Sequence, residues 1–286
     1  MAPSPSSART AIYIDRRFRA STPGQSPRTA IADTDCHDHV DGLVDYAVPR
    51  STTGCKKDNL EDKLMRKVIV GAFVSLDGVM QAPGGPREDP TGGFHYGGWV
   101  MPLMDEVFGE EVDKLFAQPF DLLLGRKTYE IFAAHWPYAE GGPDDAMART
   151  FNSITKHVAT RKGLDLNWKG SVALRDAALD VAGLKQENGP ALITQGSSDL
   201  IRTLLANDLV DEINLFTFPI VLGNGKTLFD DGAKATAFKL TDHRVSPNGI
   251  VITRYERAGA VKTDDYSMDP PTPAEVARRE KMQREG

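Results

Sequence analysis

The feature that most constrains this chain is a nearly continuous apolar run at residues 67–75, rich in Val and Ile. Runs without polar alternation are typical of strands that are buried on both faces, as in parallel sheets. Shorter apolar runs follow it, and segments with helical spacing lie between them. We expect strands at 67–75, 120–125, 156–160, 171–174, 191–195 and 212–218, and helices at 101–118, 126–136, 146–153, 176–186 and 199–206. This alternation predicts an α/β fold with a mostly parallel central sheet flanked by helices.

The last part of this region has a different pattern. Residues 238–245 and 249–257 alternate between apolar and polar side chains, and the turn Ser246-Pro247-Asn248-Gly249 joins them. Alternating segments joined by such a turn indicate an antiparallel hairpin. We therefore expect one domain over residues 65–258 that ends in an antiparallel C-terminal hairpin.

The segments on either side of this domain differ from it in composition. Residues 1–64 are rich in Ser, Pro, Thr, Arg and Asp, which predicts a disordered leader, and residues 1–30 resemble a transit peptide. The alternative is that translation starts at Met65, because codons for Leu60-Glu61-Asp62 can spell a ribosome-binding sequence. The leader would then be an upstream mis-translation. Residues 259–286 are expected to form a charged tail with an exposed helix from about Pro273.

Composition and charge narrow the function classes. Lys and Arg total 34 against 40 Asp and Glu, a formal net charge of -6, whereas a general nucleic-acid binder usually has a basic surface. No apolar stretch approaches the roughly 18 residues of a membrane span. The two cysteines cannot form a disulfide framework, and Cys36-His37-Asp38-His39 is too crowded for the usual metal-ligand spacings. We therefore expect a cytoplasmic protein that binds a small molecule, with no metal, nucleic acid or membrane partner.

One candidate ligand site lies where the strand at 120–125 meets the helix after it. This junction reads Gly125-Arg126-Lys127-Thr128. A helix N-terminus offers free N–H groups and a partial positive charge, and glycine lets a ligand approach the backbone. Arg and Thr side chains can in addition donate hydrogen bonds to phosphate oxygens. The alternative is a well-capped helix with Arg and Lys on its surface.

Two more strand ends carry residues suited to an anion. Gln195-Gly196-Ser197-Ser198 joins a buried strand to a helix, although a serine there could serve only as the N-cap. Thr160 and Arg161 stand at the end of another strand, where the alternative is a solvated basic turn. Carboxyl ends of parallel strands share one edge of the sheet. Three such sites fit a dinucleotide better than a single phosphate, although no G-x-G-x-x-G follows the first strand.

Four motifs along the domain form a known set. They are Ser75-Leu76-Asp77-Gly78, Gly125-Arg126-Lys127-Thr128, Gln195-Gly196-Ser197, and residues 219–226, which read P-I-V-L-G-N-G-K. The set resembles the dihydrofolate-reductase-like superfamily. It most resembles the branch that contains the reductase domain of the riboflavin-biosynthesis deaminase-reductase, here in a stand-alone form. The resemblance covers about residues 65–257 and implies a dihydrofolate-reductase-like fold.

The resemblance also implies a cofactor and its binding residues. The cofactor would be NADPH, with Arg126 and Thr128 on its 2′-phosphate and pyrophosphate and Lys127 beside them. Thr160 and Arg161 would flank the adenosine ribose, and Arg161 is a second candidate for the 2′-phosphate. The pyrophosphate would also meet the turn that follows Gln195, which is formed by Gly196, Ser197 and Ser198.

The implied reaction is reduction of a pterin-like or ribosylaminopyrimidine compound, of the 5-amino-6-(5-phosphoribosylamino)uracil reductase type. Two alternatives stay open on the same fold. One is dihydrofolate reductase-like activity, and the other is a non-catalytic nucleotide- or ligand-binding protein. Family members often dimerise through the sheet edge and the C-terminal hairpin, so the resemblance also implies a homodimer.

The substrate half of the site has weaker candidates. Asp77 follows the first strand, so we expect it to point into the central cleft and to supply or orient a proton. The alternative is an Asp-Gly turn that bonds only its own backbone. Phe94 and Trp99 belong to a Gly-rich loop that could close over the heterocycle, or they could be ordinary loop anchors. In the turn that follows residue 222, Gly223 and Lys226 are candidate substrate contacts.

Overall fold

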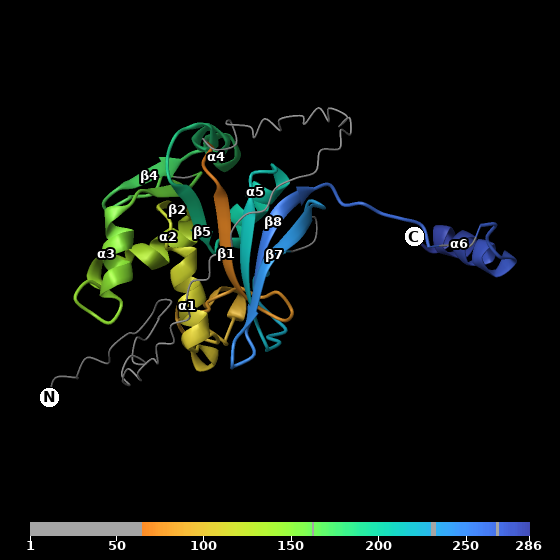
Figure 1. Ribbon diagram of the computed structural model, residues 1–286, viewed down its shortest axis with the longest axis horizontal. Coiled ribbons are helices and arrows are strands. Elements are labelled where there is room, and N and C mark those ends of the chain that lie inside the picture. Colours follow the sequence, from red (N-terminus) through yellow and green to blue (C-terminus); the bar gives the residue numbers. More distant parts are fainter. Residues whose placement is uncertain (1–64, 162, 230–232, 267–268) are drawn as a thin grey trace, which may run out of the picture.

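An eight-stranded sheet forms the centre of the molecule (Figure 1). The computed structural model describes residues 65–161, 163–229, 233–266 and 269–286. The strands are β1 Val68–Ser75, β2 Phe120–Gly125, β3 Lys156–Ala159, β4 Ser171–Leu174, β5 Ala191–Gln195, β6 Glu212–Phe218, β7 Ala237–Val245 and β8 Val251–Gly259. The predictions for residues 1–64, both the disordered leader and the alternative start at Met65, lie outside these ranges or at their edge.

The strand order is β4-β3-β2-β5-β1-β6-β8-β7. The pairs from β4 to β6 are parallel, and β8 pairs antiparallel with both β6 and β7. The predicted α/β class, with a mostly parallel sheet and an antiparallel C-terminal hairpin, is confirmed.

The first strand lies near the middle of the sheet and explains why its sequence has no polar alternation. β1 pairs in parallel with β5 on one side and with β6 on the other. Every residue of β1 is buried, because helices or loops cover both faces. A strand in that position requires apolar side chains on both faces.

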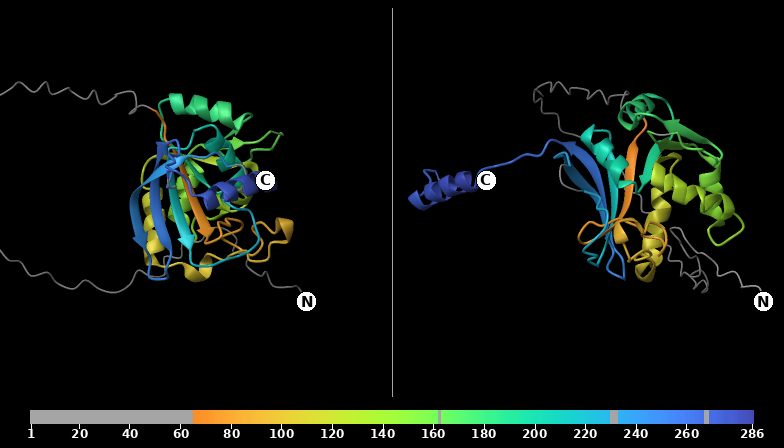
Figure 2. Two further views of the ribbon diagram at one scale, coloured as in Figure 1. Left: turned by 90° about the vertical axis from the view of Figure 1, so that its right-hand side faces the viewer. Right: turned by 180° about the vertical axis from the view of Figure 1, so that it is seen from behind.

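Helices cover both faces of the sheet (Figure 2). They are α1 Glu106–Leu115, α2 Arg126–Ala133, α3 Asp145–Ser153, α4 Ala177–Gln186 and α5 Ser198–Ala206, with short 3-10 turns at Thr91–Gly93, Met101–Leu103 and Trp136–Tyr138. Side chains of α4 and α5 pack with β1 and β5 in one core cluster. Those of α1, α2 and α3 pack in two clusters that contain the opposite faces of the same strands.

One predicted helix is shorter in the structure. The sequence predicts a helix over 101–118, but α1 begins at Glu106. Asp105 is its N-cap, and its carboxylate accepts a hydrogen bond of 2.9 Å from the Phe108 N–H. A residue with extended backbone and a capping carboxylate ends the preceding turn and starts a new helix, so the apolar spacing before it belongs to a separate 3-10 turn.

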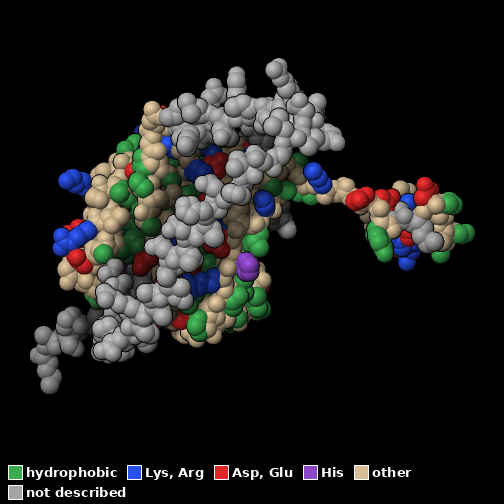
Figure 3. Space-filling view, viewed as in Figure 1, with side chains coloured by type: hydrophobic (Ala, Val, Ile, Leu, Met, Phe, Trp, Pro, Cys, Tyr) green, Lys and Arg blue, Asp and Glu red, His purple; other side chains and the backbone are tan. Residues whose placement is uncertain are grey.

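The last helix, α6 Pro273–Glu285, lies away from the sheet (Figure 1, and Figure 2, right). None of its residues is buried, and its acidic and basic side chains are intermixed (Figure 3). No helix within the described ranges combines the length and the hydropathy that a membrane span requires. Those ranges also hold no group of three or more His, Cys, Asp or Glu side chains arranged for a metal ion.

An aromatic cluster joins α1 to the central strands. Phe108 of α1 is fully buried, with its ring centroid 5.2 Å from that of Phe73 on β1 and 5.6 Å from that of Phe216 on β6. Tilted and edge-on aromatic pairs at these separations add to the free energy gained by burial alone.

Replacing Phe108 by Ala should therefore lower the free energy of unfolding by about 3–5 kcal/mol, as expected for an aromatic core truncation. Urea denaturation measures the change. The control is Leu179→Ala on α4, where the side chain is 71% exposed and the expected change is within about 0.5 kcal/mol. A loss below about 1 kcal/mol at Phe108 would contradict this description of the core.

Candidate active site

A cleft of about 1130 Å³ opens at the carboxyl ends of the parallel strands. This edge of an open α/β sheet is where ligands bind, because the strand-to-helix turns converge there. All the residues that the sequence predicts for the cofactor line this cleft: Gly125, Arg126, Lys127, Thr128, Thr160, Arg161, Gln195, Gly196, Ser197 and Ser198. The structure thus brings the three predicted anion sites into one cavity.

Two helix N-termini at the cleft are left without side-chain caps. The N-cap residues of α2 and α5 are Gly125 and Ser197, and neither side chain caps its own helix. By contrast, Asp105 caps α1 and Asp176 caps α4. First-turn N–H groups need an acceptor, so α2 and α5 hold free donors and a partial positive charge at the cleft. Such a pair of helix ends suits an anionic ligand.

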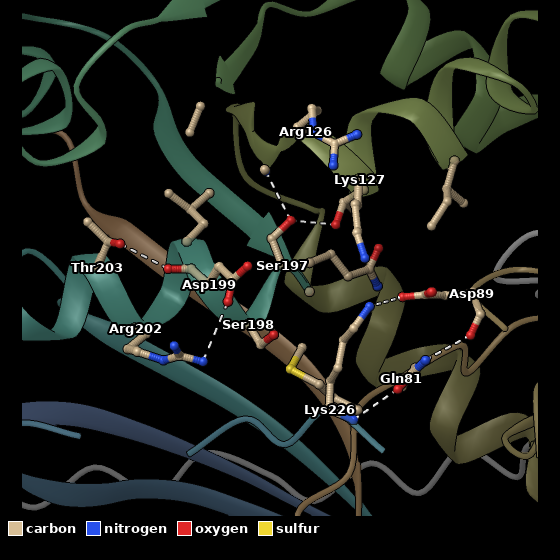
Figure 4. Close-up of a pocket in the computed structure, with 18 of the residues that line it drawn as sticks. Gln81, Asp89, Arg126, Lys127, Ser197, Ser198, Asp199, Arg202, Thr203 and Lys226 are labelled. Carbon is tan, nitrogen blue, oxygen red and sulfur yellow. Dashed lines mark hydrogen bonds and ion pairs between the residues drawn. The ribbon is translucent and has the colours of Figure 1, made fainter. Parts of the chain in front are cut away.

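The Ser197 side chain joins the two helix starts instead of capping either one (Figure 4). Its Oγ accepts a 3.0 Å hydrogen bond from the Gly125 N–H and makes a hydrogen bond with Thr128 Oγ1. Gly125 is required here, because a Cβ at this position would lie 2.6 Å from Ser197 Oγ. The β2–α2 and β5–α5 turns are therefore held at a fixed separation. We call the set of Gly125, Thr128, Gly196, Ser197 and Ser198 the cradle.

The backbone of the β5–α5 turn is strained. Gly196 has φ 84° and Ser197 has φ 66°, so two successive residues are left-handed. Glycine takes this conformation freely, whereas a non-glycine residue there costs about 1–3 kcal/mol. Strain of this kind persists where the surroundings impose it, and at Ser197 the hydrogen bonds to the β2–α2 turn do so. Ser197 thus occupies the N-cap position that the sequence alternative gives to a serine of this turn, but its side chain does not cap the helix.

Several arginines line the cleft. Arg161 follows β3, lines the cleft as predicted and is exposed, and two arginines that sequence reasoning missed line it too: Arg175 after β4 and Arg202 on α5. Arg175 shows the same signal as Arg161, a basic residue directly after a short strand. Arg126 lines the cleft but forms an exposed ion pair with Glu130, with both contacts at 2.9 Å.

The opposite wall of the cleft is formed by the loop after β1 and the turn after β6. Gln81 donates hydrogen bonds of 2.9 Å to the carbonyl oxygens of Asp89 and Thr91, and its amide oxygen accepts a 3.0 Å bond from the Lys226 N–H. Lys226 also forms an ion pair with Asp89 and a 3.0 Å hydrogen bond with Thr91 Oγ1 (Figure 4). Lys226 therefore lines the cleft and fixes the loop to the turn.

Glu88 is a carboxyl group in this wall that sequence reasoning missed. Its Oε2 accepts hydrogen bonds from the N–H groups of Gly84 at 2.6 Å and Gly85 at 3.1 Å. Its Oε1 accepts no hydrogen bond from any described residue. Burial, opposed by these two amide bonds, raises the pKa of Glu88 to about 7. The only sequence signal for Glu88 as a site residue is its position in the long loop after β1.

The expectation that Asp77 points into the cleft is wrong. The described residues that line the cleft do not include Asp77 or Gly223. The Asp77 carboxylate accepts hydrogen bonds from Ser75 Oγ at 2.5 Å, from the Leu222 N–H at 3.1 Å and from the Gly223 N–H at 2.7 Å. These bonds lower the pKa of Asp77, and the bond from Ser75 has the largest effect. Asp77 thus holds the turn that carries Lys226.

The aromatic loop residues are anchors in this structure. Phe94 is 4% exposed and Trp99 is 7% exposed, and neither is among the described residues that line the cleft. The Trp99 Nε1–H donates a 2.8 Å hydrogen bond to the Gln81 carbonyl, and Phe94 packs against Gly225. Their burial fixes the loop so that Glu88 and Asp89 face the cavity.

The raised pKa of Glu88 predicts a pH-dependent stability. A carboxyl group whose pKa rises from 4.5 to about 7 on folding binds its proton more tightly in the native state, so stability falls as pH rises through this window. Glu88→Gln should remove this fall and be more stable than the wild type at pH 8 by up to about 3 kcal/mol.

Urea unfolding across this pH window measures the effect, with the exposed Glu256→Gln on β8 as the matched control. Equal pH dependence in the Glu88 variant and the wild type would show that Glu88 keeps an ordinary pKa.

Comparisons with known proteins agree with the resemblance. Residues 66–252 match the family model of the RibD C-terminal domain. The uncharacterized protein YyaP of Bacillus subtilis (strain 168) is 27% identical over 197 residues, which cover 68% of this chain and 96% of YyaP.

Two solved structures give weaker similarities. A pyrimidine reductase-like protein from Corynebacterium diphtheriae is 14% identical, with a TM-score of 0.44, over 68% of this chain and 92% of that chain. Dihydrofolate reductase from Enterococcus faecalis, complexed with NADP(H), is 15% identical, with a TM-score of 0.43, over 67% of this chain and 96% of that chain. Because the family model spans most of the described sheet and its cleft, the chain belongs to the RibD C-terminal domain family.

Proposed function

We propose that this protein is an NADPH-dependent reductase of a pterin-like or ribosylaminopyrimidine heterocycle, of the 5-amino-6-(5-phosphoribosylamino)uracil reductase type. The observation that carries the proposal is the cradle, where Ser197 holds two uncapped helix N-termini side by side at one cleft. Membership of the RibD C-terminal domain family supports reductase chemistry at this cleft.

The cleft fits a dinucleotide in its donors and in its size. The free N–H groups of α2 and α5 suit a pyrophosphate, and Thr160 and Arg161 lie farther along the same edge, after β3, where an adenosine ribose would follow. The volume of about 1130 Å³ exceeds the roughly 300–1,000 Å³ of usual small-molecule sites, as a site for a cofactor and a substrate together would.

Arginine supplies the preference for NADPH over NADH. Its planar fork matches the oxygens of a 2′-phosphate. Arg161 is exposed at the cleft and forms no ion pair with another described residue, and Arg126 can leave Glu130 at little cost because exposed pairs contribute little free energy. We therefore assign Arg161 the main role and Arg126 a second one.

The reaction needs a hydride, which NADPH supplies when bound, and a proton. Glu88 is a carboxyl group that lines the cleft, and its pKa of about 7 leaves it partly protonated at neutral pH. A group with a pKa near the working pH is suited to general acid catalysis. We assign Glu88 the task of holding that proton and Asp77 the task of positioning the Lys226 turn. The homodimer and the cytoplasmic location stay predictions.

Loss of NADPH absorbance with a panel of pterins, dihydrofolate and ribosylaminopyrimidines tests the activity. Turnover of a ribosylaminopyrimidine or a pterin is the expected result. Turnover of dihydrofolate alone would favour the dihydrofolate reductase alternative. Tight NADPH binding without turnover of any compound would favour the non-catalytic binding protein.

Arg161→Ala should weaken NADPH binding by about tenfold or more, because a charge-assisted phosphate contact is lost, and should leave NADH binding nearly unchanged. Fluorescence titration with each nucleotide gives both dissociation constants. Lys239→Ala, on the exposed face of β7 away from the cleft, is the control. Equal losses for NADPH and NADH would remove Arg161 from the 2′-phosphate site.

A further inference from the structure

Two lysines point toward each other across the cleft. Lys127 comes from the first turn of α2, and its ammonium group extends away from the cradle toward Lys226 of the opposite wall (Figure 4). The facing Lys226 ammonium, together with partial burial, lowers the pKa of Lys127. Like charges in such proximity repel, so the pair is stabilised by any anion that lies between them.

The carboxylates nearby do not neutralise this pair. Asp89 is engaged by Lys226 and by Thr91, and these bonds outweigh burial and lower its pKa, so it supplies one negative charge. Glu88 is partly protonated near neutral pH. Arg126 adds positive charge, but Glu130 already pairs with it. Two ammonium groups therefore face one committed carboxylate, which leaves an excess of positive charge in the cleft.

We propose that the Lys127–Lys226 pair is an anion subsite, separate from the cradle, which binds a phosphate or carboxylate group of the substrate. The subsite connects the two walls of the cleft, one lysine coming from each wall. Lys226 lies on the wall that also carries Gln81, Glu88 and Asp89, opposite the helix ends proposed for the cofactor. An anionic substrate bound there would lie beside Glu88.

This assignment changes the role that the sequence suggests for Lys127. The motif around Gly125 predicts it as a cofactor residue, but the side chain leaves the α2 N-terminus and meets Lys226 instead (Figure 4). The proposal rests on the proposed function in one respect, because NADP⁺ is expected to fill the remaining cleft.

Calorimetry with inorganic phosphate, on the full chain without nucleotide and then saturated with NADP⁺, tests the subsite. We expect phosphate to bind in both states, and Lys127→Gln and Lys226→Gln each to weaken it by about tenfold or more. Lys226→Arg keeps the charge and should retain most of the affinity. Lys239→Gln should change nothing. Circular dichroism shows whether each variant is folded.

The outcomes separate the two proposals. Loss of the lysine-dependent phosphate binding on saturation with NADP⁺ would assign the pair to a cofactor phosphate and overturn the subsite. Absence of phosphate binding in both states, or equal binding by the wild type and both glutamine variants, would overturn it as well. If NADP⁺ itself does not bind, the proposed function fails, whereas phosphate binding that requires both lysines would still support the anion subsite.

Discussion

The hydrogen bonds of the Ser197 side chain determine how the cleft is built. One oxygen atom accepts from the Gly125 backbone and bonds Thr128, and it does not cap the helix that it precedes. Because the N-cap residue of α2 is a glycine, both α2 and α5 begin without a side-chain cap at the same cleft. The left-handed backbone at Ser197 is the conformational cost of this arrangement. Without the Ser197 hydrogen bonds, the strand ends would still lie at the same edge of the sheet, but the two helix N-termini would not be fixed relative to each other.

The second wall of the cleft depends on a different set of contacts. Gln81 joins the loop to the turn after β6 by accepting a hydrogen bond from the Lys226 N–H, and Trp99 donates a hydrogen bond to the Gln81 carbonyl. Asp77 holds the same turn by accepting a hydrogen bond from the Gly223 N–H. These contacts place Lys226, Asp89 and Glu88 toward the cavity. The chain has a net charge of -6, yet the cleft collects lysines and arginines from both walls. Basic and acidic side chains are otherwise mixed on the face shown in Figure 3.

The sequence predicts the sheet well because strands that are buried on both faces need apolar side chains throughout. A strand such as β1, covered on both faces, needs an unbroken apolar run, and Gly125 and Gly196 mark two of the turns where strands meet helices. The residues at these strand ends, which the resemblance assigns to the cofactor, all line the cleft. The direction in which a turn faces is set by distant contacts, so Asp77 could not be placed from its neighbours: its partners lie at Leu222 and Gly223. The cleft position of Glu88 likewise depends on how Phe94 and Trp99 bury the loop.

The central claim is that the two helix N-termini joined by Ser197 bind the cofactor phosphates. Backbone amide NMR during titration with NADP⁺ tests it most directly. We expect saturable shifts of the amides of residues 126–128 and 198–200, stronger than those of amides on the β7–β8 hairpin. Binding that leaves those amides unchanged, or shifts centred elsewhere in the chain, would contradict it.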